Sequence, residues 1–489
     1  MTAMELPAKI SKPPAALMHE RAYVGGAWVG ADDCRPVTNP STRETLGHVP
    51  ALTRDTVTAA ISAASQALPA WKAMLAPERA AILMHWHDLI LSNADDLAEL
   101  LTFEQGKPFA DAQGEIAYGA GFIKWFAAEA QRTYGDVIPS HLPNRKLFTQ
   151  QEPLGVVALV TPWNFPSAML TRKAGAALAA GCTAICVPSM ETPFSALALA
   201  DLAEQAGIPA GVFNVLTGDA GVIVPMLCEE PVVRGLSFTG STEIGRLIAR
   251  TCGATVKRLS LELGGHAPFI VCADADPESA ARAAVDAKFQ TSGQDCLAAN
   301  RIFVHRDIVE DFTRHFVHHT QLLKVADGFE RGAQLGPLIH DRAVDKCMDH
   351  IEDAVSKGAR LLHGGARMDP DSLFFEPAVL ADVTDAMKIY REETFGPVAA
   401  ITPFEDDAAV IVAANDSEYG LAAYVFTRDL SRAVRMSEAL EFGMVAINTV
   451  KFTGAPIPFG GIKQSGLGRE GARQGIEEFL ETKYVCMAI

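Results

Sequence analysis

The stretch Val156-Val-Ala-Leu-Val-Thr161 decides the fold, because it begins a regular alternation of short apolar runs and helical segments. The expected strand and helix pairs are 156–161 with 169–180, 183–187 with 195–205, 213–216 with 221–229, and 236–239 with 242–252. Short strands that alternate with helices predict a parallel sheet joined by right-handed crossovers. The fold class is therefore α/β.

A second series of the same kind runs from residue 268 to about 447, with strands expected at 269–271, 302–304 and 399–404. The chain before the first series is expected to hold a loose arm over residues 1–20 and a hairpin around Gly25-Gly26. Four helices should follow: one with Asp55 as N-cap, one with Pro77 in its first turn, one from residue 93 to near Gly106, and one over 112–132.

Cys296 is the candidate nucleophile. It follows the small, turn-prone residues Ser292-Gly-Gln294 and precedes the expected strand 301–305. Glu262 stands alone in an apolar run just before a glycine pair. A thiol and a shielded carboxylate suit acyl chemistry, in which the thiolate attacks and the carboxylate later activates water. Single residues of either kind are usually structural, so the other motifs of the chain have to support this pair.

Composition excludes several classes of function. The 489 residues are 49% hydrophobic and 21% charged, which is ordinary for a globular protein of about two or three domains. A net charge of −17 argues against binding to nucleic acid or to anionic membranes. Nine cysteines without metal-ligand spacing indicate free thiols, a reducing compartment and no metal site. No signal peptide is recognisable, so the cytoplasm is the expected location.

Six blocks, in order, resemble the aldehyde dehydrogenase superfamily over nearly the whole chain. They are Thr161-Pro-Trp-Asn-Phe-Pro166, Phe238-Thr-Gly-Ser-Thr-Glu-Ile-Gly245, Leu261-Glu-Leu-Gly-Gly265, Gly293-Gln-Asp-Cys296, Glu392-Glu-Thr-Phe-Gly-Pro-Val398 and Pro458-Phe-Gly-Gly-Ile-Lys-Gln-Ser-Gly466. Within the superfamily the chain is most similar to succinate-semialdehyde dehydrogenases, as in Met169-Leu-Thr-Arg-Lys173. The resemblance implies NAD(P)-dependent oxidation of an aldehyde to an acid.

The resemblance also assigns catalytic roles. Cys296 would form a thiohemiacetal and then a thioester, and Glu262 would activate the hydrolytic water. The Asn164 amide and the Cys296 backbone N–H would hold the oxyanion, and Lys173 would assist the network around the thiol. Because members that pass the acyl group to coenzyme A lack the carboxylate base, Glu262 favours hydrolysis to the free acid. Asp295 would raise the pKa of Cys296 if it faces the thiol, a point that the sequence leaves open.

For the cofactor, no Gly-x-Gly-x-x-Gly fingerprint follows a predicted strand. The family variant matches instead, with Ser241 or its neighbour capping a helix that faces the pyrophosphate. The cofactor residues implied are Thr161, Pro162, Trp163, Val187, Ser189, Met190, Gly240, Ser241, Gly245, Leu263, Glu393 and Phe395. Val187 replaces a family lysine that binds the adenosine ribose or a 2′-phosphate, which favours NAD over NADP. Impaired cofactor binding, with the fold retained for binding alone, is an alternative.

For the substrate, Arg172 and Ser465 match residues that hold the distal carboxylate in succinate-semialdehyde dehydrogenases, and Gln290 replaces a second arginine. Glutamine has no charge and cannot form a bidentate fork. The prediction is an ω-oxo carboxylate such as succinate semialdehyde, and neutral or longer aldehydes are the alternative. Phe165, Phe289 and Phe452 would line a tunnel or belong to the core.

Aldehyde dehydrogenase-like architecture implies two Rossmann-type parallel-sheet domains and a small β oligomerisation arm. Residues 1–132 and 148–259 would bind the dinucleotide, and 260–447 would carry the nucleophile. Residues 133–147 and 468–489 would form the arm, and 448–467 would be a return segment. The implied assembly is a homodimer or homotetramer that acts on a small aldehyde.

Overall fold

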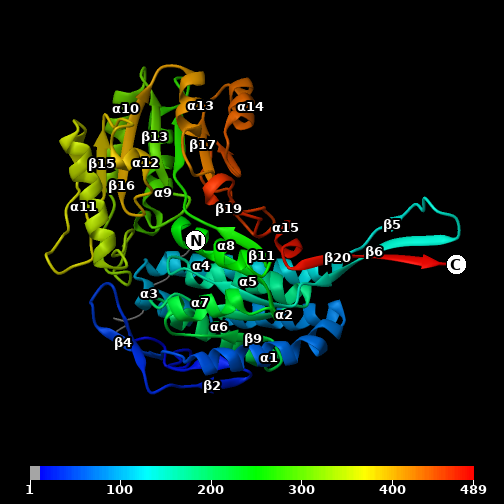
Figure 1. The fold of residues 1–489 in the computed structure, drawn as a ribbon. Coiled ribbons are helices and arrows are strands. Elements are labelled where there is room, and N and C mark those ends of the chain that lie inside the picture. Colours follow the sequence, from blue (N-terminus) through cyan, green and yellow to red (C-terminus); the bar gives the residue numbers. More distant parts are fainter. Residues whose placement is uncertain (1–11) are drawn as a thin grey trace.

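An eight-stranded, mostly parallel sheet holds the first strand–helix series, in the order β19-β11-β10-β7-β8-β9-β1-β2. The computed structural model describes residues 12–489 (Figure 1). The strands are β1 (Ala22–Val24), β2 (Ala27–Val29), β7 (Val156–Val160), β8 (Thr183–Val187), β9 (Phe213–Val215), β10 (Val233–Thr239), β11 (Arg258–Glu262) and β19 (Gly466–Leu467). β7, β8, β9, β10 and β11 are parallel, as the sequence predicts.

Helices cover both faces of this sheet, because its central strands are apolar on both sides. Val157 and Leu159 pack into one buried cluster, and Val156, Ala158 and Val160 into another. The helices are α1 (Arg54–Ala73), α2 (Ala76–Ser92), α3 (Ala94–Gln105), α4 (Phe109–Glu129), α5 (Pro166–Ala180), α6 (Pro193–Gln205), α7 (Ala220–Glu229) and α8 (Thr242–Gly253). The first cluster includes side chains of α2 to α6, and the second includes side chains of α1, α7 and α8.

A seven-stranded sheet holds the second series, in the order β14-β15-β16-β13-β12-β17-β18. Its strands are β12 (Ala267–Val271), β13 (Ala299–His305), β14 (Arg360–His363), β15 (Ala378–Ala381), β16 (Val398–Phe404), β17 (Ala422–Phe426) and β18 (Met444–Ile447). The helices of this unit are α9 (Pro277–Phe289), α10 (Val309–Gln321), α11 (Asp341–Ser356), α12 (Lys388–Arg391), α13 (Asp407–Asn415) and α14 (Leu430–Ala439). Two units that each combine a mostly parallel sheet with helices confirm the predicted α/β fold class.

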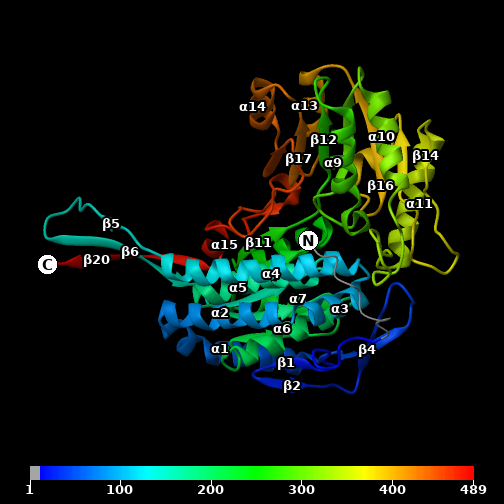
Figure 2. The same ribbon diagram turned by 180° about the vertical axis from the view of Figure 1, so that it is seen from behind.

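A three-stranded antiparallel arm projects from the first unit and ends in the C-terminus (Figures 1 and 2). It consists of β5 (Val137–Ile138), β6 (Arg145–Pro153) and β20 (Leu480–Ala488), in the order β20-β6-β5. β6 and β20 pair along their whole length, from Arg145 opposite Ala488 to Pro153 opposite Leu480. The remaining elements are β3 (Cys34–Thr38) with β4 (Thr45–Pro50), the short helix α15 (Gln474–Glu477), and 3-10 turns over Ala130–Arg132, Gln290–Gly293 and Lys463–Ser465.

Several local expectations need correction. Thr53, not Asp55, caps α1, because the Thr53 side chain accepts from the backbone N–H of Thr56. Residues 1–11 of the predicted loose arm lie outside the described residues. Residues 12–20 pack against the rest of the chain, because Leu17 is buried and the His19 ring stacks on Trp28. The fourth helix begins at Phe109 rather than residue 112, and residues 130–132 continue it as a 3-10 turn.

The expected domain boundaries agree only in part with the sheets of the structure. The boundary at 259/260 falls inside β11, which pairs with β10 in the first sheet, so the first unit reaches at least Glu262. β19, from the end of the expected return segment, also joins this sheet. β6 continues to Pro153, six residues beyond the expected arm boundary at 147. The assignment of functions to these units stays a prediction.

Candidate active site

Glu262 and Cys296 approach each other where the two sheets meet. Glu262 is the last residue of β11 in the first sheet, and Cys296 lies three residues before β13 in the second. Gly265, three residues after Glu262, touches the Cys296 backbone: a Cβ atom at Gly265 would lie 2.1 Å from the Cys296 carbonyl oxygen. Only glycine fits there. The site therefore lies between the carboxyl edge of one sheet and the amino edge of the other.

The Cys296 thiol is in an environment that disfavours its charge. Burial raises the pKa of Cys296 well above its usual value, and the Asp295 and Glu393 carboxylates raise it further, while Arg172 opposes them. Asp295 is itself 9% exposed and accepts a hydrogen bond from the Leu297 backbone N–H at 2.9 Å. The structure thus settles the orientation that the sequence left open: Asp295 is turned inward, near the thiol.

Replacing Asp295 with asparagine is expected to lower the pKa of Cys296, because it removes a like charge beside the thiolate. The alkylation rate of Cys296 by iodoacetamide, followed by peptide mass spectrometry, should reach its midpoint at a pH lower by about one unit. Asp307→Asn, an exposed carboxylate in another loop, serves as the matched control. An unchanged or higher midpoint for Asp295→Asn would contradict this account of the site.

Glu262 belongs to a buried cluster of four charged groups. Burial raises the pKa of Glu262 well above its usual value, the Glu470 carboxylate adds to this, and Arg172 and Lys173 lower it. Both carboxylate oxygens of Glu262 are buried without a hydrogen-bond partner among the described residues. Glu470 instead pairs with both Arg172 and Lys173. Glu262 is therefore a shielded carboxyl group with free oxygens, as a general base requires.

Lys173 and Glu470 are held firmly against this carboxylate. Lys173 Nζ donates to Ser237 Oγ at 2.9 Å and to Glu470. Burial lowers the pKa of Lys173, and Glu470 opposes this effect. The pKa of Glu470 is lowered although burial acts against its charge, because Arg172 and Lys173 both stabilise the carboxylate. Sequence reasoning missed Glu470, which lies four residues after the block that ends at Gly466, because nothing in the sequence places this segment beside α5.

Asn164 lies on the loop between β7 and α5, and its position is fixed from both sides. Its side-chain amide donates to the Gln294 carbonyl at 2.9 Å, two residues before Cys296. The backbone carbonyl of Asn164 accepts a hydrogen bond from Lys107 Nζ at 2.7 Å. The buried Lys107 also pairs with Glu115 at 2.6 Å. The amide is thereby held against the nucleophile loop, and Lys107 and Glu115 are further site residues that no sequence motif revealed.

The predicted cofactor residues gather at a switch point of the first sheet. β8 lies on one side of β7 and β10 on the other, so the strand order reverses between β7 and β10 and leaves a crevice outside their carboxyl ends. Ser241 caps α8 there by accepting from Ile244 N at 3.4 Å. The hydroxyl oxygens of Thr161 and Thr239 are buried without a partner in the described chain. A capped helix N-terminus and two unpartnered hydroxyls fit a phosphate-bearing cofactor.

The other predicted cofactor residues surround this crevice. Gly245 lets α8 approach β11, since a Cβ there would lie 2.3 Å from Leu263 Cδ2. Glu393 accepts from the Gly265 N–H at 2.9 Å, and burial raises its pKa to about 7. Phe395 meets Trp163 edge to face, with ring centroids 5.5 Å apart. Pro162 and Gly240 lie in the same two loops, after β7 and β10.

Among the described residues 187–191, at the end of β8 and just after it, no side chain carries a positive charge, as the sequence indicates. Val187 is 1% exposed, and its carbonyl accepts from the Thr161 N–H at 3.1 Å. The Ser189 hydroxyl contacts the Glu191 carboxylate, and Met190 Sδ accepts from Gly218 N. Glu191 is a further anionic group beside this loop, which sequence reasoning did not consider.

The predicted carboxylate clamp is not assembled in this structure. Arg172 is 2% exposed, and its guanidinium lies 4.2 Å from the Phe459 ring and pairs with Glu470. Ser465 is fully buried, donating to the Gly264 carbonyl at 2.6 Å and accepting from Gly420 N at 2.9 Å. Gln290 is exposed. Ser465 therefore bridges the Gly264 and Gly420 segments through its hydroxyl group, and its role toward substrate stays a prediction.

The three aromatic residues that could line a substrate tunnel differ in burial. Phe289 is core, 2% exposed in the cluster beneath α9 and α10. Phe165 is partly exposed, with Lys107 Nζ 4.0 Å from its ring centroid. Phe452 meets Tyr424 edge to face, and the Tyr424 hydroxyl donates to the Leu297 carbonyl at 2.9 Å, one residue after Cys296. Only Phe165 and Phe452 remain as candidates for contact with substrate.

A partly buried thiol and a shielded carboxylate, placed where two α/β sheets meet and beside a dinucleotide-type crevice, define the architecture of a cysteine-dependent oxidoreductase. The family model described as "Aldehyde dehydrogenase family" matches residues 28–485. An aspartate-semialdehyde dehydrogenase (non-phosphorylating) of Halomonas elongata is 54% identical, with 96% of each chain covered. The succinate-semialdehyde dehydrogenase [NADP(+)] of Escherichia coli is 51% identical, covering 97% of this chain and 98% of the relative. A crystal structure of an E. coli NADP-dependent enzyme matches with a TM-score of 0.97 and 50% identity, covering 98% and 100%.

This chain belongs to the aldehyde dehydrogenase family. It is an NAD(P)-dependent enzyme that oxidises an aldehyde to the carboxylic acid, as the motifs predict. Within residues 12–489, no helix combines the length and apolar character that a membrane crossing requires.

Proposed function

We propose that the enzyme oxidises a short aldehyde that carries a carboxylate at its other end, such as succinate semialdehyde. The observation that carries this proposal is Arg172, a buried guanidinium close enough to Cys296 and Glu262 to interact electrostatically with both. A permanent cation beside the nucleophile attracts an anionic substrate in spite of the net charge of −17. The names of the relatives from Halomonas and E. coli both specify semialdehydes of dicarboxylic acids, which supports the same class.

Met169 occupies the edge of the Arg172 guanidinium at which we expect the substrate carboxylate to bind. Arg172 Nη2 donates to Met169 Sδ at 2.9 Å, while its Nε faces Glu470. A thioether is a weak acceptor and a flexible side chain, so a carboxylate would replace it readily and would not disturb the pair with Glu470. The proposed clamp therefore uses one edge of Arg172 and does not require Ser465 or Gln290.

The test compares kcat/KM for succinate semialdehyde with that for butanal, an uncharged aldehyde of equal carbon count. A ratio well above ten is expected, since one charge-assisted contact contributes about 1.5–3 kcal/mol and tenfold corresponds to about 1.4 kcal/mol. Arg172→Lys, which keeps the charge opposite Glu470 but loses the planar fork, should lower this ratio. Butanal turnover in that variant is the internal control for folding. A wild-type ratio near one would overturn the proposed substrate class.

In the proposed mechanism, the Cys296 thiolate attacks the aldehyde carbon, and the Asn164 amide and the Cys296 N–H stabilise the resulting oxyanion. A bound nicotinamide supplies the hydride acceptor. Glu262 then takes a proton from water, which attacks the thioester and releases the acid. Lys173 holds Glu470 and lowers the pKa of Glu262, so it is a positioning residue.

The cofactor would lie in the crevice beside β7 and β10, and we propose that it is NAD rather than NADP. Ser241 and the first turn of α8 would face the pyrophosphate, and Glu393, Phe395 and Trp163 would border the nicotinamide side. Valine at 187 offers no charge to a 2′-phosphate, and Glu191 adds a carboxylate that would repel one.

NAD should give a kcat/KM at least about tenfold above that with NADP, because one missing charge-assisted hydrogen bond is worth at least about 1.5 kcal/mol. Val187→Lys should narrow this preference by improving NADP use, whereas Val187→Leu, a neutral control, should not. Equal or better turnover with NADP in the wild type would show that another cation replaces the family lysine.

We further propose that the arm mediates a homodimer or homotetramer. Its surface exposes large apolar side chains that a monomer would leave in water. These are Tyr134, Val137, Ile138, Leu142, Tyr484, Met487 and Ile489. A cytoplasmic location is proposed from the cysteines, all nine of which lie within the described residues as free thiols.

A further inference from the structure

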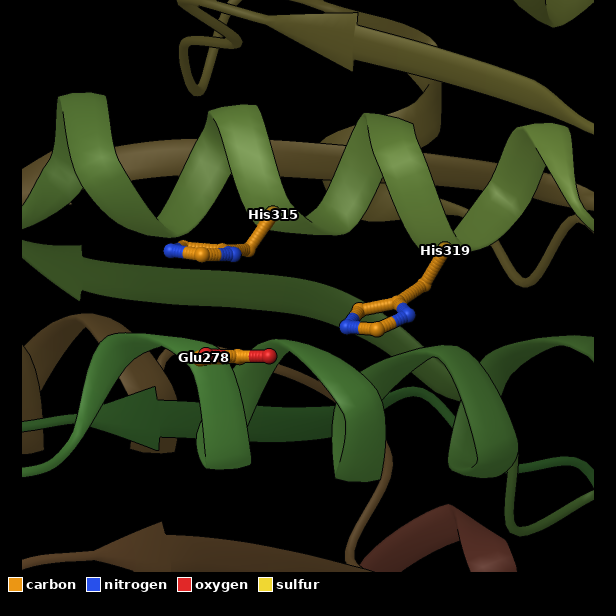
Figure 3. A group of neighbouring side chains, drawn as sticks. All are labelled: Glu278, His315 and His319. Carbon is orange, nitrogen blue, oxygen red and sulfur yellow. The ribbon is translucent and has the colours of Figure 1, made fainter.

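His315, His319 and Glu278 form a side-chain cluster on the outer surface of the second unit, away from the active site. Both histidines project from α10 toward Glu278 in the first turn of α9 (Figure 3). One nitrogen or oxygen of each of the three residues lies within 4.8 Å of the others. Neither the family resemblance nor the proposed reaction uses these residues.

The spacing of the two histidines suits a chelate. Residues four apart lie one above the other on the same face of a helix, so both imidazoles reach a single point. α9 and α10 pack against each other, with the Phe289 and Phe316 rings 6.0 Å apart, so the carboxylate of Glu278 is presented from a fixed neighbour. Ligand atoms of a tetrahedral zinc ion are about 3.3–3.5 Å apart at bond lengths of about 2.0–2.1 Å. Small side-chain rotations would close the observed gap.

The imidazoles have lone pairs available. His315 Nε2 lies 3.2 Å from Arg314 Nη2, and a guanidinium can only donate, so this nitrogen is an acceptor. His319 Nε2 is buried without a hydrogen-bond partner in the described part of the chain. This nitrogen is therefore free to act as a ligand when the ring is neutral. Metal binding requires neutral imidazole.

We propose that His315, His319 and Glu278 bind a divalent transition-metal ion of the zinc class, with water completing the coordination. The ligand set of two nitrogens and one carboxylate oxygen selects such ions over Mg²⁺ or Ca²⁺, which require oxygen ligands. The nearby guanidinium groups of Arg282 and Arg314 oppose a cation. Arg314 is mostly exposed and pairs with Asp311 at 2.9 Å, so it can leave His315 at little cost. A bound ion would join α9 to α10.

The experiment titrates Zn²⁺ into the full-length, metal-free protein by calorimetry and follows Tm in parallel. One Zn²⁺ per chain should bind at this site and raise Tm, because a ligand that binds only the folded state stabilises it. His315→Asn and His319→Asn should each weaken the affinity at least about tenfold, since even the loss of an outer-shell partner costs about 10–100-fold. His318→Asn, on the same helix but outside the cluster, is the matched control. All three variants should keep wild-type aldehyde turnover without added metal.

Free thiols are the competing ligands, and Co²⁺ distinguishes them. Thiolate ligation gives Co²⁺ an intense charge-transfer absorption in the near ultraviolet, whereas a nitrogen and oxygen ligand set does not. The proposal predicts visible Co²⁺ bands without that absorption, lost in the His315→Asn/His319→Asn double variant. Equal Zn²⁺ affinity in the double variant, a thiolate spectrum, or no Zn²⁺ binding in the wild type would each overturn it.

Discussion

Cys296→Ala is expected to lower kcat/KM for aldehyde oxidation by at least about a thousandfold, because the nucleophile has no substitute. The eight other thiols are either buried elsewhere or exposed far along the chain: Cys34 lies in β3 and Cys486 in the arm. No second thiol stands next to Cys296 in sequence, so none can take over the attack. The measurement is steady-state formation of the reduced dinucleotide with succinate semialdehyde.

Cys486→Ala is the matched control for this result, since it removes an exposed thiol from a strand and should leave kcat/KM unchanged. Thermal unfolding of both variants should resemble that of the wild type, because Cys296 is only partly buried and alanine removes a single sulfur atom. Turnover of Cys296→Ala within tenfold of the wild type would mean that hydride is lost from an aldehyde that never bonds to the enzyme. The thioester mechanism would then be wrong.

Glu262→Gln is expected to separate the two halves of the reaction. The first turnover should still release one equivalent of reduced dinucleotide per active site, because Cys296 and Asn164 remain. Steady-state turnover should then fall by about 100-fold or more, since general bases contribute about 10²–10⁴-fold. Stopped-flow absorbance gives the burst, and mass spectrometry should find the acyl group on Cys296.

Glu262→Gln should leave the ion pairs around this position intact. Glu262 accepts no hydrogen bond from the described residues, whereas Glu470 pairs with Arg172 and Lys173, so the neutral amide leaves no cation unpaired. Glu262→Asp, which keeps the carboxylate but shortens its reach, should restore part of the steady-state rate. If the first turnover of Glu262→Gln slows as much as the steady state, Glu262 acts before the thioester forms. Undiminished turnover would remove it from the mechanism.

The pH dependence of the wild type should follow from the same two groups. Burial raises the pKa of both Cys296 and Glu262, and each is active only when deprotonated. The rate should therefore rise with pH on the alkaline side of neutrality. Asp295 raises the pKa of Cys296 and is not among the groups that shift the pKa of Glu262, so Asp295→Asn distinguishes the contribution of Cys296 from that of Glu262.

The sequence alone determined the architecture and the reacting pair. Strands such as β7 and β8 are apolar on both faces, and helices separate them, so only a covered parallel sheet can bury them. Their ends were predicted within a few residues. Cys296 and Glu262 were found because each stands in a motif block with a characteristic order. The helix limits were less accurate: Thr53 rather than Asp55 caps α1, since both residue types are good N-caps and the helix begins already at Arg54.

Only the tertiary structure decided which charged groups meet. Arg172 and Ser465 looked alike in the sequence as candidate substrate ligands, yet Ser465 bridges two backbone segments and Arg172 keeps one edge free of Glu470. Glu470 lies 297 residues from Lys173, and Glu278 approaches His315 and His319 from another helix. Sequence patterns report local periodicity, whereas electrostatic interaction depends on distance through space. Such pairings therefore become visible only once the sheets and helices have been placed.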